Sequence, residues 1–247
     1  MNPLGAMTFN LRTAGADHTD LPRGNGWARR RPLAQALLHR VAPDVVGLQE
    51  STDVQVDDLR QGYEVLRHEE LALLYRPDRL EALDGGVETL GTFGDPDPWG
   101  DRWVQWQQFR GLGELEGQRL LVLNTHLSVE GDHLPQARQV FALADRRQRS
   151  VPGDWPVLVM GDFNFDASAL LAELAWFDAL ADHRGTFHDF YGEGGPPDGS
   201  GNPRLDFVAT RGLEVAESEV CTDFVTVGGI DVFPSDHYPL WVKTVSR

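Results

Sequence analysis

A buried strand that runs directly into polar residues is the feature that most constrains how this chain can fold. Residues 156–164 read Pro-Val-Leu-Val-Met-Gly-Asp-Phe-Asn, and the apolar run from Val157 to Met160 is typical of a strand covered on both faces. Asp162 and Asn164 follow at once, and side chains two positions apart point to the same side of an extended chain. Because Gly, Asp and Asn are also common turn residues, the stretch predicts either a turn or a functional site.

The same pattern recurs at other predicted strands. Apolar stretches are found at 6–10, 45–49, 120–123, 204–208 and 240–243, and polar residues stand at or beside their ends: Asn10, Glu50, His126, Asp206, Asp236 and His237. Asp206 lies within its strand, where a carboxylate is costly unless it is paired, and the segment 234–239 offers the candidate partner. Each residue alone is compatible with a surface or structural role, but their recurrence favours a shared site.

Helices are predicted between these strands from the spacing of apolar residues. The first runs from about 30 to 40, because Pro32 suits the first turn of a helix. Further helices are expected around 137–144 and 170–177. Short strand candidates separated by Pro-Asp and Gly-Gly turns predict hairpins within 61–90.

The formal net charge of −16 argues against tight, sequence-independent binding to nucleic acid through a basic face. It does not exclude a nuclease, since a site for divalent cations needs clustered carboxylates and a bound metal reverses the local field. No apolar run is long enough to cross a bilayer, and the N-terminal residues lack the pattern of a secretory signal. The single cysteine, Cys221, is expected within a strand and cannot form an internal disulfide. Together these features favour a cytoplasmic protein with no membrane partner.

The residue types at the strand ends favour metal-assisted hydrolysis. Carboxylate and amide oxygens outnumber histidines and there is no thiolate cluster, which suits Mg²⁺ or Mn²⁺ rather than zinc. A histidine beside separate acids suits the activation of a water molecule. Metal, activated water and neutral donors together are what the hydrolysis of a phosphate ester requires.

The motifs resemble those of the endonuclease/exonuclease/phosphatase superfamily and occur in the family order. They are Thr8-Phe9-Asn10, Gln49-Glu50, Asn124-Thr125-His126-Leu127, Gly161-Asp162-Phe163-Asn164, Leu205-Asp206-Phe207 and Ser235-Asp236-His237. The resemblance covers nearly the whole chain and implies a single domain over residues 1–247 with an α/β (α+β) fold. That fold is a four-layer α/β/β/α sandwich of two mixed, mostly antiparallel sheets flanked by helices. The chain is most similar to small bacterial members near the deadenylase and nocturnin branch.

The resemblance also implies roles for the matched positions. Glu50 is similar to the principal metal ligand, and Asn10 and Asp236 to further ligands that bind directly or through water. His237 is similar to the catalytic histidine, which Asp206 polarises and orients. The resemblance therefore supplies the partner that Asp206 needs.

Three further positions complete the set of catalytic residues implied by the resemblance. Asp162 is similar to the residue that orients or deprotonates the attacking water, and Asn164 and His126 to donors to the phosphate oxygens. Whether Asp162 or His237 is the general base stays open. Proximity to strand-end loops suggests three additional substrate-binding candidates: Arg102, Arg138 and His188.

We therefore expect a phosphodiesterase or nuclease that hydrolyses a nucleic acid or a nucleotide-like phosphodiester by in-line attack of water. One alternative is a phosphatase for a sugar, inositol or nucleotide phosphomonoester, and another is a non-catalytic scaffold of the same fold. The chain departs from the abasic-site enzymes of the family in lacking a basic surface for DNA, which places repair of duplex DNA in doubt. The expected partner is the phosphate-ester substrate, and no obligate protein partner is evident.

Overall fold

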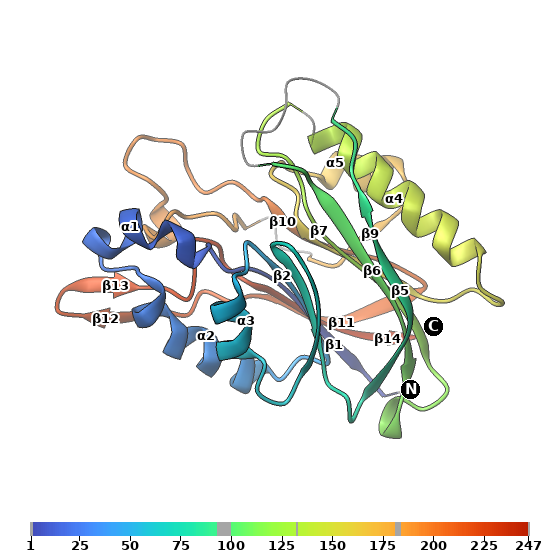
Figure 1. The fold of residues 1–247 in the computed structure, drawn as a ribbon. Coiled ribbons are helices and arrows are strands. Elements are labelled where there is room, and N and C mark those ends of the chain that lie inside the picture. Colours follow the sequence, from blue (N-terminus) through green and yellow to red (C-terminus); the bar gives the residue numbers. More distant parts are fainter. Residues whose placement is uncertain (1, 93–99, 132, 181–183, 247) are drawn as a thin grey trace.

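Two six-stranded sheets form the centre of the computed structural model, which describes residues 2–92, 100–131, 133–180 and 184–246 (Figure 1). The first sheet has the order β11-β14-β1-β2-β4-β3 and comprises β1 (Leu4–Asn10), β2 (Val45–Gln49), β3 (Glu64–His68), β4 (Leu71–Tyr75), β11 (Leu213–Val220) and β14 (Leu240–Ser246). The second has the order β5-β6-β7-β8-β10-β9 and comprises β5 (Leu80–Thr89), β6 (Trp103–Gly111), β7 (Arg119–His126), β8 (Val157–Asp162), β9 (Phe177–Asp178) and β10 (Asp206–Arg211).

Both sheets are mixed and mostly antiparallel. β1 pairs with β2 in parallel, and so does β7 with β8, whereas the other neighbouring strands run antiparallel. A separate hairpin of β12 (Val225–Val227) and β13 (Ile230–Val232) precedes the segment that leads into β14. The expectation of two mixed sheets is confirmed.

Helices cover the outer face of each sheet and complete four layers (Figure 1). α2 (Trp27–Val41) and α3 (Asp53–Leu59) share an apolar cluster with the outer face of the first sheet, which includes Leu37, Val56 and Phe9. α4 (His133–Arg149) and α5 (Ser168–Glu173) share another with the second sheet, which includes Phe141 and Val159. A third cluster lies between the sheets. Three separate cores therefore hold the four layers together by burying apolar surface.

The core between the sheets becomes polar toward one end. Along β8, Val157 and Val159 face the helices, whereas Leu158 and Met160 face the other sheet, as expected for residues that alternate. The next residue on the inner face is Asp162. The inner faces of β7 and β1 also change from apolar to polar side chains along the strand. On β7 these residues are Leu120, Val122, Asn124 and His126, and on β1 they are Leu4, Ala6, Thr8 and Asn10. The alternation of each strand therefore directs these polar side chains into one layer.

Two local predictions need correction. The first helix begins at Trp27 rather than near Arg30, and Pro32 lies inside it. Its N-terminus is capped from a distance, because the Asp17 side chain accepts a hydrogen bond from the Trp27 N–H at 2.9 Å. Cys221, which was expected within a strand, lies just beyond the end of β11 and is buried. No helix in the described part of the chain is both long and apolar enough to cross a membrane.

Candidate active site

Strand register brings three of the expected residues side by side in the second sheet. Asp162, the last residue of β8, lies opposite Asp206, the first residue of the antiparallel β10. It also lies beside His126, the last residue of the parallel β7. Asn10 ends β1 in the facing sheet. The positions of these side chains are therefore fixed by backbone pairing rather than by flexible loops.

Gly161 allows the close strand pairing that places Asp162. Its φ is 153°, and a Cβ at this position would lie 2.0 Å from the Thr125 carbonyl oxygen of the neighbouring strand. Any larger residue would therefore force β7 and β8 apart, directly beside His126 and Asp162.

Asn124 joins the two sheets beneath the site. Its Nδ2 donates to the carbonyl oxygens of Leu48 at 3.0 Å and Ala72 at 3.2 Å, and its Oδ1 accepts from Gln49 Nε2 at 2.7 Å. This approach is possible because Gly47 has no side chain: a Cβ there would lie 2.7 Å from Asn124 Oδ1. The hydrogen bonds fix the separation of the sheets and therefore the distance between the residues that each contributes.

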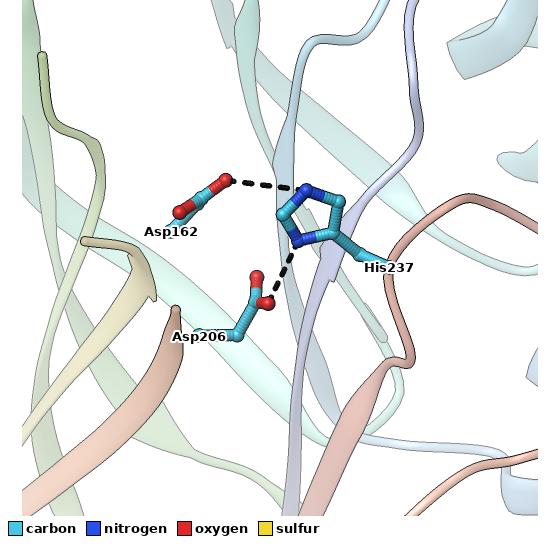
Figure 2. A group of neighbouring side chains, drawn as sticks. All are labelled: Asp162, Asp206 and His237. Atoms are coloured by element: carbon cyan, nitrogen blue, oxygen red, sulfur yellow. Dashed lines mark hydrogen bonds and ion pairs between the residues drawn. The ribbon is translucent and has the colours of Figure 1, made fainter. Parts of the chain in front are cut away.

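Asp162 contacts polar side chains from both sheets, and Figure 2 shows it facing His237. Its Oδ2 accepts from Asn10 Nδ2 at 2.9 Å and lies 3.7 Å from Nε2 of both His126 and His237. Its Oδ1 accepts from the backbone N–H of Asn164 at 2.9 Å. Burial and the neighbouring Asp206 raise the pKa of Asp162, and the two imidazoles oppose this only in part.

His237 and Asp206 form a buried pair (Figure 2). His237 Nδ1 lies 2.8 Å from Asp206 Oδ2, and since an ionised carboxylate can only accept, the proton is on Nδ1 and the ring turns Nε2 toward Asp162. Burial alone would lower the pKa of His237, but Asp206 and Asp162 outweigh it and raise that pKa well above its ordinary value. Thr186 Oγ1 in turn accepts the backbone N–H of Asp206 at 3.0 Å.

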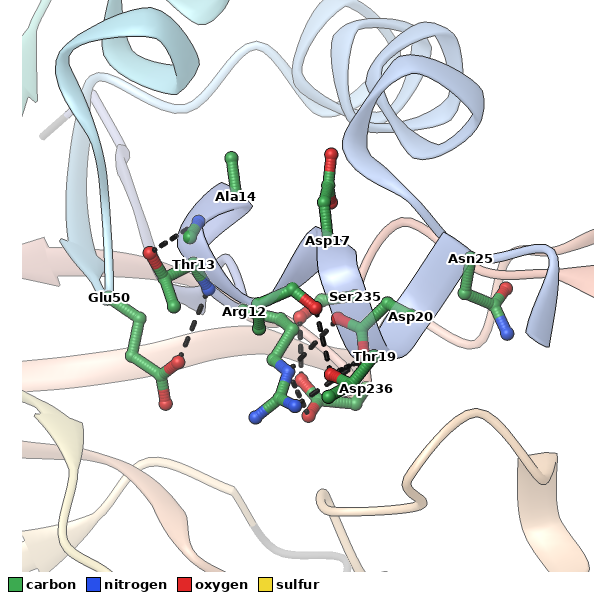
Figure 3. A network of polar contacts seen from close by, with 12 residues as sticks. Arg12, Thr13, Ala14, Asp17, Thr19, Asp20, Asn25, Glu50, Ser235 and Asp236 are labelled. Atoms are coloured by element: carbon green, nitrogen blue, oxygen red, sulfur yellow. Dashed lines mark hydrogen bonds and ion pairs between the residues drawn. The ribbon is translucent and has the colours of Figure 1, made fainter. Parts of the chain in front are cut away.

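Glu50 and Asp236 supply carboxylates on the side of the first sheet. Glu50 follows β2 in the left-handed region, with a φ of 53°, and accepts from Asn10 Nδ2 at 3.1 Å and from the Thr13 N–H at 3.2 Å. Burial would raise the pKa of Glu50, but His126 and the Asn10 hydrogen bond outweigh it and lower that pKa. Burial raises the pKa of Asp236, which lies 3.7 Å through Oδ2 from Arg12 Nε (Figure 3).

The residues fit a divalent metal. The expected ligands Glu50, Asn10 and Asp236 offer carboxylate and amide oxygens, which suit Mg²⁺ and Mn²⁺. A second group, Asp162, Asp206 and His237, has donor atoms within 4.8 Å of one another. In that group, however, the hydrogen bond between His237 and Asp206 already engages one donor of each. In the oxygen-rich group Asn10 Oδ1 likewise accepts the Arg12 N–H at 2.9 Å, so that group matches a hard cation by its ligand types alone. Both groups place buried negative charge where a cation would stabilise it.

Glu70 is a site residue that the sequence analysis missed. Its Oε1 lies 3.1 Å from His126 Nδ1 and accepts from Arg102 Nη1 at 3.0 Å. Burial would lower the pKa of His126, but the charge and hydrogen bond of Glu70 raise it. Glu70 directly precedes β4, which runs antiparallel to β2 and therefore starts at the edge where β2 ends. An acid just before a predicted hairpin strand was the signal that could have identified it.

The three additional candidates have different environments. Arg102 is buried and contacts His126 through Nη1 at 3.1 Å. Arg138 is not brought to the site: it is exposed on α4 and donates to Glu173 at 2.8 and 2.9 Å, because its helical position faces away from the sheet.

His188 is buried next to the site, where its ring stacks on Tyr238 with 4.0 Å between ring centroids, and burial lowers its pKa to about 3. Its backbone N–H donates to the Asp236 carbonyl oxygen at 2.9 Å. Asn164 Nδ2 donates to the carbonyl oxygen of Leu127 at 2.9 Å, which holds the loop after β8. Both side chains therefore engage the protein around the site in this structure.

Comparisons with known proteins find one matching family profile and several solved structures of similar fold. The profile of the Endonuclease/Exonuclease/phosphatase family matches residues 7–237, and a search of curated protein sequences finds no match. A Bacteroides thetaiotaomicron protein of that family superposes with a TM-score of 0.85 and 23% identity over 100% of this chain and 96% of its own.

Two further solved structures are similar in fold. A mannosyl-6-phosphatase from B. thetaiotaomicron VPI-5482 has a TM-score of 0.82 and 23% identity over 98% of this chain and 99% of its own. The human Nocturnin catalytic domain, solved with a bound sulfate anion, has a TM-score of 0.70 and 18% identity over 100% of this chain and 94% of its own. At these identities the likeness concerns the fold.

Proposed function

The chain belongs to the endonuclease/exonuclease/phosphatase family, whose members are metal-dependent hydrolases of phosphate esters, and we propose that it is a phosphodiesterase. Its substrate is a nucleic acid or a nucleotide-like phosphodiester, cleaved by in-line attack of an activated water. The observation that carries the proposal is the position of Asp162 Oδ2, which lies 3.7 Å from Nε2 of both His126 and His237. A proton acceptor between two potential donors suits a reaction in which a nucleophile loses a proton while negative charge develops nearby.

Three side chains of the site have separate roles in the proposed hydrolysis. Asp162 holds the attacking water and accepts its proton, for which its raised pKa is favourable. His237, kept protonated by Asp206, donates through Nε2 to a phosphate oxygen, and this assignment makes Asp162 rather than His237 the base. His126 presents its own Nε2 as a second donor, since its Nδ1 faces Glu70.

Glu50, Asn10 and Asp236 are the residues that would hold the divalent metal, Mg²⁺ or Mn²⁺. When bound, the metal polarises a phosphoryl oxygen and neutralises developing charge. Glu50 suits the role of principal ligand because its neighbours lower its pKa and keep it ionised in a partly buried position.

A second candidate function is a phosphatase for a small phosphomonoester. Arginines around the site are each paired with an acid that offsets their charge: Arg12 with Asp20, Arg23 with Asp189 and Arg102 with Glu70. A polynucleotide needs a row of cations to neutralise successive phosphates, and these pairs do not supply one. That one structural relative is a mannosyl-6-phosphatase also supports a small substrate.

Metal-dependent hydrolysis by the wild type, His237→Ala and Asp162→Asn tests the proposal. The panel comprises single-stranded RNA, single- and double-stranded DNA, a chromogenic phosphodiester and a set of phosphomonoesters. We expect diester cleavage that both substitutions abolish without loss of folded structure by circular dichroism. His39→Ala, an exposed histidine on α2, is the matched control and should leave turnover unchanged.

The outcomes separate the two functions. Release of inorganic phosphate from monoesters alone would replace the first proposal by the second. Full activity in either site variant would contradict both.

A further inference from the structure

Arg12 has an unusual and firmly held backbone conformation at the edge of the site. Its φ is 50°, in the left-handed region that residues with a side chain seldom adopt. Its N–H donates to Asn10 Oδ1 at 2.9 Å, and its carbonyl oxygen accepts from Arg30 Nη2 at 2.9 Å and from Gln55 Nε2 at 3.0 Å. Such a conformation persists only where the surroundings enforce it, and it is concentrated at functional sites.

The Arg12 side chain is anchored along one edge only. Nε donates to Asp20 Oδ2 at 3.2 Å and Nη2 to Asp20 Oδ1 at 3.4 Å (Figure 3). Asp20 is itself fully buried and receives a further hydrogen bond from Thr19 Oγ1 at 3.2 Å. The guanidinium is planar, so an acid bound at the Nε and Nη2 edge leaves Nη1 directed away from it. The side chain remains 31% exposed, and within the described part of the chain Nη1 has no hydrogen-bond partner.

The position of this guanidinium places its remaining donors among the candidate metal ligands. Nε lies 3.7 Å from Asp236 Oδ2, and Figure 3 shows the group between Glu50 and Asp236. An arginine side chain stays charged in proteins. A substrate phosphate that binds beside Glu50 and Asp236 would therefore meet a cation with unused donors.

Arg30 provides an internal contrast, because it uses its donors within the protein. It is fully buried and donates to the carbonyl oxygens of Asn25 at 2.6 Å, Leu11 at 2.7 Å, Arg12 at 2.9 Å and Pro234 at 3.1 Å. Arg30 thereby fastens the loops that carry the site. An arginine that only neutralised buried acids would need neither a left-handed backbone nor an exposed guanidinium edge. Arg12 has both of these features.

We propose that Arg12 is a substrate-binding residue whose free guanidinium edge contacts a non-bridging oxygen of the substrate phosphate. Asp20 is its positioning residue, since it fixes the opposite edge. The inference rests on the proposed phosphoesterase function and adds a specific contact to it. Arginine suits this role because its fork of donors matches the oxygens of a phosphate.

Arg12→Met tests the contact through substrate binding. We expect this variant to raise KM for the best phosphate ester of the panel about 10- to 100-fold, the range for loss of a hydrogen bond to a charged group. The Kd for inorganic phosphate, measured by calorimetry with Mg²⁺ present, should rise by a similar factor. Arg12→Lys, which keeps the charge but not the fork, should restore part of the loss. Asp20→Asn should weaken phosphate binding by a smaller factor.

Arg76→Met is a closely matched control. Arg76 donates through Nε and Nη2 to Asp78 at 3.2 and 2.7 Å and is 33% exposed, so it shares the pairing and exposure of Arg12. It follows β4 at Tyr75, the end of that strand opposite Glu70. We expect its KM and phosphate Kd to equal those of the wild type.

The outcomes distinguish this inference from the proposed function. If Arg12→Met binds phosphate and turns over substrate like the wild type, or changes only the Tm, the inference is wrong and the phosphoesterase stands. If the wild type neither hydrolyses phosphate esters nor binds phosphate, both proposals are wrong. Should Arg12→Met fail to fold, the same comparison of KM and phosphate Kd is made with Arg12→Lys.

Discussion

The two histidines that face Asp162 differ in how their second nitrogen is held. His237 Nδ1 lies 2.8 Å from Asp206, whose side chain is 2% exposed and makes no other ion pair in the described residues. His126 Nδ1 lies 3.1 Å from Glu70, whose side chain is 28% exposed and is shared with Arg102. A buried, unshared carboxylate stabilises a protonated ring more than a partly exposed, shared one, because water and the competing cation weaken the second interaction.

This difference assigns unequal roles to two similar pairs. The pKa of His237 is raised well above its ordinary value, and that of His126 is raised by less. We infer that His237 carries the charge that matters most to the reaction and that His126 chiefly orients a donor. The proposed site is therefore asymmetric, although both Nε2 atoms lie at the same distance from Asp162.

The largest expected effect comes from removing each ring in turn. His237→Gln should lower kcat by about 10³-fold or more, in the upper part of the range for loss of a general acid or base. His126→Gln should lower kcat by about 10- to 100-fold, since it removes one donor to the phosphate. Steady-state kinetics on the best substrate measures both. Equal losses would contradict the asymmetry.

A smaller effect on kcat is expected when both imidazole rings are kept and the carboxylate paired with each ring is replaced by an amide. Asp206→Asn should lower kcat by about 10²-fold, because His237 loses both its orientation and the charge that keeps it protonated. Glu70→Gln should lower kcat by about 10-fold or less, because Arg102 still contacts His126. A greater loss in Glu70→Gln than in Asp206→Asn would reverse the assignment of the two pairs.

The same pairs show what the sequence could predict. His237, Asp206, His126 and Asp162 were identified because each stands beside a recognisable apolar strand. The pairing of Asp206 was anticipated because a carboxylate within a strand needs a partner. The order of the motifs, rather than the periodicity of single strands, indicated the layered fold, since strand patterns do not specify which sheets pack together.

The residues that were missed depend on tertiary structure. Glu70 precedes its strand, and only antiparallel pairing with β2 brings it to the site. Arg12 follows Asn10, but its role depends on Asp20 and on a left-handed backbone that no local pattern indicates. Conversely, Arg138 was selected for its closeness to a loop in sequence, and the helix turns it outward. Sequence reasoning found residues that end strands and failed where a side chain reaches across the fold.

The smallest expected effect, a dependence of stability on pH, sharpens the comparison without relying on turnover. The folded state raises the pKa of both His237 and His126, so each contributes stability that is complete below the unfolded pKa of about 6.5 and is lost as pH rises through the folded value. In a metal chelator, the wild-type Tm should therefore fall as pH rises above about 6.5, by about 2–4 °C for each kcal/mol lost. Asp206→Asn should flatten this slope strongly for two reasons. The substitution lowers the pKa of His237, and it removes the charge repulsion that raises the pKa of Asp162. Glu70→Gln should flatten the slope less, since the pKa of His126 is raised by less than that of His237 and Asp162 stays near the ring.

The lowered pKa of Glu70 itself affects stability only at more acidic pH, below about 4.5, and so does not disturb the comparison. A wild-type Tm that is constant across this range would mean that neither histidine gains a proton on folding, and the distinction between the two pairs would then have no electrostatic basis.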